Sequence, residues 1–326
     1  MRRPFCVLAL AVLAGGTAFA QQPAADVEQK SRAGSALLSA PDMGPPPLPA
    51  LPVRPVPVVP EGGPAATATV VSAPAVELLF HADLDGRLAT PACAGKPSGG
   101  AQPSYAALIG RLTALRSDAT GAALPAPVAL LGGNVATPDL FGASLLERGQ
   151  DGVDKLADIL GHGRYDAIAL GHHELSLDSA TLGQLVAALK ARGMPVVATN
   201  LRCDGHVRGV CPAVQPDVLL KRGELAVGVV ATISPAVVPG IPPATFRGLA
   251  LDDPAGAART AIRGLRKRGA KMIVLMVQGP RDATALDRVD ALSRQLAAAP
   301  AEERPDVILA GGLAGDLGDR PVRTLR

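Results

Sequence analysis

The sequence predicts an α/β fold, a layered domain in which mostly parallel sheets are flanked by helices. Short apolar runs alternate with segments of helical periodicity throughout residues 75–326. Four of the apolar runs also end on a polar cluster, and open α/β sheets build their sites at the carboxyl ends of parallel strands. The four clusters are Asp83-Leu84-Asp85, Gly133-Asn134, Gly171-His172-His173-Glu174 and Gln278-Gly279.

The expected elements follow one another in a regular order. The first half of the domain comprises strand 76–82, helix 105–117 capped by Ser104, strand 127–131, helix 152–160 behind Asp151, and strand 166–170. The second half comprises helix 180–191 behind Ser179, strand 196–199, a hairpin of strands 218–221 and 225–231, helix 255–267, strand 272–277, helix 283–298 and strand 307–310. Gly193 and Pro195 mark the end of the third helix. No internal repeat is visible.

Two segments precede this domain. Residues 1–20 resemble a secretory signal, with the basic Arg2-Arg3, a short apolar stretch and the cleavage motif Ala18-Phe19-Ala20. Residues 21–74 are rich in proline, which predicts a disordered polyproline-type linker. We therefore expect a secreted or periplasmic protein without a transmembrane anchor. The alternatives are an uncleaved signal that acts as an anchor, and a linker that binds a partner protein of unknown identity.

Composition excludes one class of partner. The net charge is only +3 over 326 residues and the basic residues are scattered. The chain has two Tyr, five Phe and no Trp, so it lacks the aromatic platforms on which nucleic-acid bases stack. Nucleic acid is therefore not an expected partner.

The cysteines predict one disulfide. Cys203 and Cys211 flank the short loop RCDGHVRGVC, and in an oxidising compartment they would most simply pair with each other. Cys93 is then either a free thiol or an alternative partner for one of them. His206 lies inside the loop, but the spacing does not match a zinc site.

The series of motifs over about residues 76–314 resembles the calcineurin-like metallophosphoesterases, and within them the 5′-nucleotidase branch. The matching segments are LLFHADLDGRL, LLGGN, YDAIALGHHE, VVATNL, ELAVGVVATISP, IVLMVQG and DVILAGGLA, in the family's order. The resemblance implies a metallophosphoesterase-type fold and an ancestral hydrolase of phosphorylated small molecules. Such enzymes hold two metal ions with Asp, His and Asn ligands, and the ions activate water and clamp the phosphoryl oxygens.

The resemblance assigns four residues to the metal site, most of them altered. Asp83 matches a family ligand, and Asp85 stands where the family has a histidine. Asn134 replaces the aspartate that bridges both ions, which removes a negative charge. His172 replaces an asparagine ligand. An alternative is that these are ordinary turn and loop residues.

Two further residues match the catalytic positions, and three ligand positions are lost. His173 matches the histidine that contacts the substrate or its leaving group, and Glu174 matches the acid that orients this histidine. The family's remaining histidine ligands correspond to Gln278, Gly312 and Ala314.

These departures predict an exported 5′-nucleotidase-like protein whose dinuclear site is eroded, making it non-catalytic or weakly active. One alternative is an active phosphoester hydrolase that uses a single divalent ion (Mn, Zn, Fe or Ca) bound by Asp83, Asp85 and His172, with Asn134 as a weak fourth ligand. The other is a stalked interaction module at the cell envelope. Compared with the family, the sequence ends at Arg326 before the closing strands of the first domain and the C-terminal base-binding domain, so we expect either a fragment or a truncated gene.

Overall fold

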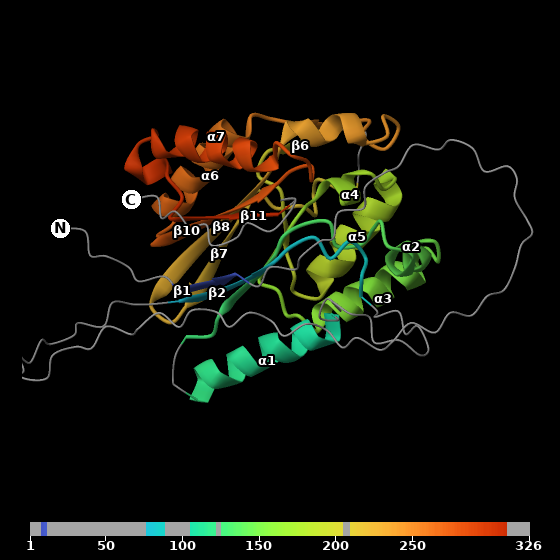
Figure 1. Cartoon of the computed structure of the whole chain (residues 1–326), viewed down its shortest axis with the longest axis horizontal. Coiled ribbons are helices and arrows are strands. Elements are labelled where there is room, and N and C mark those ends of the chain that lie inside the picture. The colour runs from blue at the N-terminus through green and yellow to red at the C-terminus, as the bar shows by residue number, and fades with distance from the viewer. Residues whose placement is uncertain (1–7, 12–75, 89–104, 122–124, 205–208, 312–326) are drawn as a thin grey trace, which may run out of the picture. The chain divides into compact units, whose positions relative to one another are not determined.

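The computed structural model describes residues 8–11, 76–88, 105–121, 125–204 and 209–311. Ser104, Cys93, His206, Gly312, Ala314 and most of residues 1–74 lie outside the described residues. Two sheets pack face to face, and helices cover the outer face of each (Figure 1). The predicted α/β fold with mostly parallel sheets and flanking helices is thus confirmed.

The first sheet is entirely parallel and has five strands in the order in which they occur in the chain. They are β1 (Leu8–Ala11), β2 (Glu77–His81), β3 (Val128–Leu131), β4 (Ala167–Ala169) and β5 (Val196–Val197). The edge strand β1 falls within the predicted signal peptide, so the cleavage expected after Ala20 would remove it.

The second sheet has four strands in the order β11-β10-β8-β7. Strands β8 (Leu225–Ile233), β10 (Met272–Gln278) and β11 (Val307–Ala310) are parallel, and β7 (Asp217–Arg222) pairs antiparallel with β8 as the predicted hairpin. A small antiparallel pair, β6 (Leu201–Cys203) with β9 (Leu249–Leu251), was not predicted. Cys203, at the end of β6, forms a disulfide with Cys211.

The alternation of side chains along each strand builds three apolar cores. On β3, Val128 and Leu130 face the second sheet, whereas Ala129 and Leu131 face the helices α1 (Tyr105–Gly121), α3 (Gln150–Gly161) and α5 (Ser179–Ala191). The helices α6 (Pro254–Lys267) and α7 (Ala285–Ala297) cover the far face of the second sheet. The remaining helical segments are α2 (Leu140–Leu146), α4 (His172–Leu175) and two 3-10 turns, Pro235–Gly240 and Ala301–Glu303.

Several helices begin at other residues than predicted. Asp178, not Ser179, caps α5 by accepting hydrogen bonds from the N–H groups of Ala180 and Thr181. Gly149 precedes α3, and Asp151 lies in its first turn, where an acid favours the helix dipole. The short helices α2 and α4 were missed. Gly193 ends α5 as predicted, with φ +76°.

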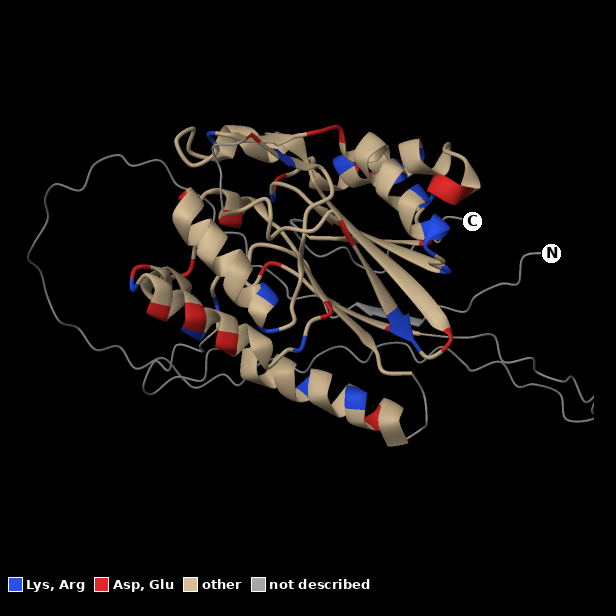
Figure 2. Cartoon of the chain, turned by 180° about the vertical axis from the view of Figure 1, so that it is seen from behind, with Lys and Arg blue, Asp and Glu red and all other residues tan. Residues whose placement is uncertain are grey.

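Both acidic and basic side chains lie on the helices, with acidic residues more frequent on α3 and basic residues on α6 (Figure 2). On α3, for example, Asp151 pairs with both Arg148 and Lys155 in exposed ion pairs. None of the described helices is long and apolar enough to cross a membrane.

Candidate functional site

The loops that follow β2 and β3 lie side by side at the carboxyl edge of the first sheet. The N–H of Asp83 donates to the carbonyl of Gly133 at 3.2 Å, and the N–H of Asp85 donates to the carbonyl of Asn134 at 2.6 Å. The sequence predicted that these polar residues would gather at one edge, and the structure brings them together with His172, His173 and Glu174 from the loop after β4.

The backbone at this edge adopts a sparsely populated conformation. Asp83, Asp85 and Asn134 have φ values of 57°, 54° and 61°. The left-handed region costs most L-residues about 1–2 kcal/mol, and Asp and Asn tolerate it best. Only one other described non-glycine residue, Arg164, has a positive φ. Such clustering is typical of a present or former functional site.

Glu174 holds the loops in place. Its buried carboxylate accepts hydrogen bonds from the backbone N–H groups of Gly171, Asn134, Val135 and Ala136 at 2.7 to 3.3 Å. Gly171 permits this close approach, since a Cβ at this position would lie 2.4 Å from the backbone nitrogen of Asn134. The hydrogen bonds of Glu174 therefore go to the backbone of the loop after β3 and to its own helix start.

His173 is oriented by other groups. Its Nδ1 lies 2.7 Å from the carbonyl oxygen of Thr137 and 3.5 Å from Oδ1 of Asp85. Because a carbonyl only accepts, Nδ1 of His173 carries a proton and donates it to this hydrogen bond. Thr137 and Asp85 thus hold the Nδ1 side of the His173 ring, whereas the hydrogen bonds of Glu174 go to backbone N–H groups.

His172 stacks obliquely against His173, with ring centroids 4.1 Å apart. The pKa of His172 is lowered to about 4, first by burial and then by the neighbouring His173 and Arg281, against the opposing effect of Asp83. His172 is therefore neutral near physiological pH. Its Nδ1 is buried and has no hydrogen-bond partner in the described part of the chain.

Asn134 uses both ends of its amide. Its Oδ1 accepts from the N–H of His173 at 3.1 Å, and its Nδ2 donates to Oδ1 of Asp83 at 2.8 Å. Because the oxygen is engaged by a backbone donor, the NH₂ group must face the carboxylate of Asp83. An aspartate at position 134 would place one of its carboxylate oxygens against Oδ1 of Asp83. The two negative charges would repel each other unless a cation lay between them. The amide of Asn134 thus contacts Asp83 directly, whereas an aspartate at this position would need a metal ion between the two carboxylates.

Arg281, which the sequence reasoning missed, supplies the positive charge of the site. Its Nη1 lies 3.1 Å from Oδ2 of Asp85, and its Nη2 lies 3.4 Å from Oδ2 of Asp83. Arg87 also contacts Asp85, at 2.6 Å. Although burial opposes the charge, Asp85 and Asp83 raise the pKa of Arg281 overall. The only signal in the sequence was a lone arginine just after the fourth polar cluster.

Gln278 lies apart from this network. It is fully buried, and its amide lies close to Gly132 and Gly311. A Cβ at Gly132 or Gly311 would lie 2.7 or 2.5 Å from its Nε2. Both amide atoms are without hydrogen-bond partners among the described residues.

The residues present do not fit a divalent ion. Asp83 and Asp85 already face a guanidinium, and Asn134 presents an NH₂ group instead of an oxygen. Within residues 76–88, 105–121, 125–204 and 209–311, no three His, Cys, Asp or Glu residues are grouped as metal ligands. Divalent ions of the hydrolytic type require several converging carboxylate or imidazole ligands.

Known structures share this fold. A 5′-nucleotidase precursor from Thermus thermophilus aligns over 72% of this chain and 41% of its own, with 20% identity and a TM-score of 0.52. A putative 5′-nucleotidase from Staphylococcus aureus aligns over 72% of this chain and 44% of its own, with 16% identity and a TM-score of 0.56. The calcineurin-like phosphoesterase YfkN from Bacillus subtilis aligns over 72% and 71%, with 15% identity and a TM-score of 0.53.

The matched region is less than half the length of the nucleotidases from Thermus thermophilus and Staphylococcus aureus. No protein-family model and no curated protein shows a significant sequence match to this chain. The structural likeness establishes the fold as that of 5′-nucleotidases and calcineurin-like phosphoesterases, as the sequence motifs predicted.

Proposed function

We propose that this chain is an exported 5′-nucleotidase-like protein in which an ion-pair network has replaced the dinuclear metal site, leaving a domain that does not hydrolyse phosphoesters at an enzymatic rate. The observation that carries the proposal is the position of Arg281, whose guanidinium contacts both carboxylates that the resemblance assigns to metal. Asn134 supports it, because its amide hydrogen bond to Asp83 needs no metal.

The chemistry explains why this replacement ends catalysis. A divalent ion lowers the pKa of a bound water to about 7 and so supplies hydroxide near neutral pH. A guanidinium offers only N–H donors and has no coordination position for water. His173 keeps an oriented Nε2, but a histidine without a metal-activated nucleophile retains only part of the mechanism.

Export is the second part of the proposal. Cleavage after Ala20 is expected from the Ala18-Phe19-Ala20 motif, and the Cys203–Cys211 disulfide suits an oxidising compartment. N-terminal sequencing of protein recovered outside the cytoplasm should begin at Gln21. Retention of Met1 in that protein would contradict cleavage.

The catalytic part is tested by assaying AMP and p-nitrophenyl phosphate with added Mn²⁺ or Zn²⁺. The wild-type protein and the Asp83→Ala variant should both be indistinguishable from a blank. Turnover approaching about 10 per second, the median for enzymes, that disappears in Asp83→Ala would instead establish an active hydrolase.

A further inference from the structure

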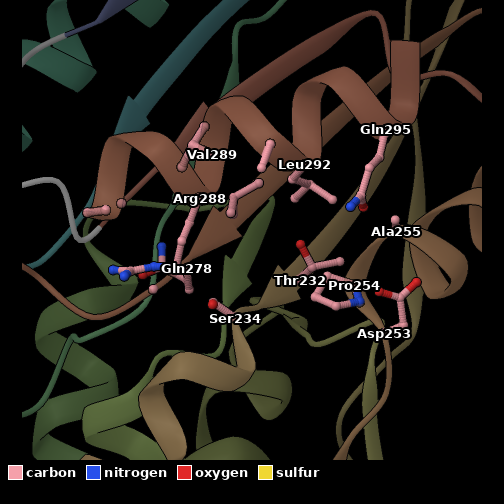
Figure 3. A pocket seen from close by; sticks show the side chains of 15 residues that line it. Thr232, Ser234, Asp253, Pro254, Ala255, Gln278, Arg288, Val289, Leu292 and Gln295 are labelled. Atoms are coloured by element: carbon pink, nitrogen blue, oxygen red, sulfur yellow. The ribbon is translucent and has the colours of Figure 1, made fainter. Parts of the chain in front are cut away.

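A pocket of about 230 Å³ opens at the carboxyl edge of the second sheet, between the start of α6 and the helix α7 (Figure 3). We propose that it binds a small uncharged molecule that carries a hydroxyl or amide group on an apolar body. The pocket shares Gln278 with the candidate site, but Asp83, Asp85, Asn134, His172, His173 and Arg281 do not line it.

Thr232, near the end of β8, supplies the polar group. It is fully buried, and its Oγ1 has no hydrogen-bond partner among the described residues. Its strand neighbour Ala231 faces the other sheet, whereas Thr232 faces the pocket below α7. A buried hydroxyl is normally paired, and it can either donate or accept. A ligand with a hydroxyl or amide would complete this pairing.

The charges at the pocket are already engaged, which favours an uncharged ligand. The guanidinium of Arg288 donates to the carbonyl of Pro280 at 3.0 Å and to Oδ1 of Asp282 at 2.9 Å. The carboxylate of Asp253 caps α6 by accepting from the N–H of Gly256 at 2.7 Å. Both charged side chains, Arg288 and Asp253, therefore already have hydrogen-bond partners within the protein.

The remaining walls set the size and the apolar character of the ligand. They are formed mainly by Pro254, Ala255, Val277, Ala285, Val289 and Leu292. An apolar cavity of about 150 Å³ is large enough for benzene. The present pocket therefore has room for one ring with a polar substituent, and Thr232 would meet that substituent.

Benzamide is a suitable probe because it combines one ring with a neutral donor and acceptor, and benzoate is its charged counterpart of similar shape. Each is titrated into the full chain labelled with ¹⁵N. Benzamide should shift the amide signals of Thr232, Ala255 and Leu292 in a saturable way, and benzoate should bind more weakly. Thr232→Val should weaken benzamide roughly five- to tenfold, the usual effect of one lost hydrogen bond.

Two further variants separate the pocket from other effects. Thr120→Val, which alters an exposed threonine on α1 remote in sequence and absent from the pocket walls, should leave benzamide affinity unchanged. Val289→Phe should fill the pocket and abolish binding while the spectrum remains that of a folded protein. The absence of saturable shifts with benzamide would overturn the proposal and leave a pocket for water only. Binding of benzamide to Thr232→Val as tightly as to the wild type would overturn it as well.

Discussion

The guanidinium of Arg281 lies 3.1 Å from the carboxylate of Asp85, although 196 residues separate the two in the chain. Arg281 follows β10 in the second sheet, and Asp85 follows β2 in the first. One side chain therefore ties together the carboxyl edges of the two sheets. This cross-link is a permanent part of the polypeptide.

Arg281→Ala should destabilise the fold. The side chain of Asp85 is 5% exposed and that of Asp83 is 13% exposed, so their charges would lose a partner with little access to water. We expect a loss of about 1–3 kcal/mol in the free energy of unfolding, since a charged hydrogen-bond partner is removed. The loss can be measured by urea denaturation.

The response of stability to Mn²⁺ distinguishes Arg281→Ala from the wild type. It should restore part of the stability of Arg281→Ala, because the freed carboxylates can then bind a cation, and it should leave the wild type unchanged. As a control, Arg192→Ala removes ion pairs with the exposed Asp158 and Asp154 and a hydrogen bond to the carbonyl of Ala188, and its stability should not respond to Mn²⁺. Equal stabilisation of wild type and Arg281→Ala by Mn²⁺ would refute the replacement of metal by arginine.

Asn134→Asp should also destabilise the protein in the absence of metal. The substitution removes the hydrogen bond to Asp83 and brings a third carboxylate beside Asp83 and Asp85. We expect a cost of about 1–3 kcal/mol near neutral pH. The deficit should shrink as the pH is lowered from about 7 to about 4, because acid relieves charge repulsion among carboxylates. A deficit that is constant over this pH range would show that charge repulsion is not the cause.

Stability should fall between pH 6.5 and about 4 because of two buried histidines, His81 and His172, whose pKa values are both lowered to about 4. Burial lowers the pKa of His81 from 6.5 to about 4, partly opposed by Asp83. In this window the unfolded chain binds protons that the folded chain excludes, so acidification favours unfolding; above pH 6.5 the contribution is constant. His81→Gln should give a shallower decline of the unfolding free energy with acidification. An unchanged slope would contradict the assignment to His81.

The Cys203–Cys211 disulfide should contribute modestly to stability. It closes a short loop, with a sequence separation of 8 residues. Replacing both cysteines by serine should lower the free energy of unfolding by about 2–3 kcal/mol on the chain-entropy model. Non-reducing peptide mapping of the wild type should recover the two as one linked peptide, and a link from Cys93 to either would argue against the pairing.

The sequence was informative where the signal is local. Runs such as Met272–Val277 are apolar and β-branched enough to identify buried strands, and parallel strands place their following residues at one edge. This is why the proximity of Asp83, Asn134 and His173 could be anticipated. The helix α4 could not be anticipated, because its four residues are too few to show a helical period.

The partners within the site were beyond prediction because they depend on how distant segments pack. Arg281 lies in a polar loop, and its contact with Asp85 exists only once the two sheets face each other. The four backbone hydrogen bonds of Glu174 likewise require the loops after β3 and β4 to meet. Sequence motifs indicated the altered positions, but the contacts of Arg281 and Glu174 follow only from the structure.

Isothermal titration of Mn²⁺ into the purified, metal-stripped protein tests the central claim most directly. If Arg281 has replaced the metal ions, the wild type gives no saturable heat, and Arg281→Ala gains a weak site that Asp83→Ala then removes. Stoichiometric binding of Mn²⁺ to the wild type that is lost in Asp83→Ala would contradict the account.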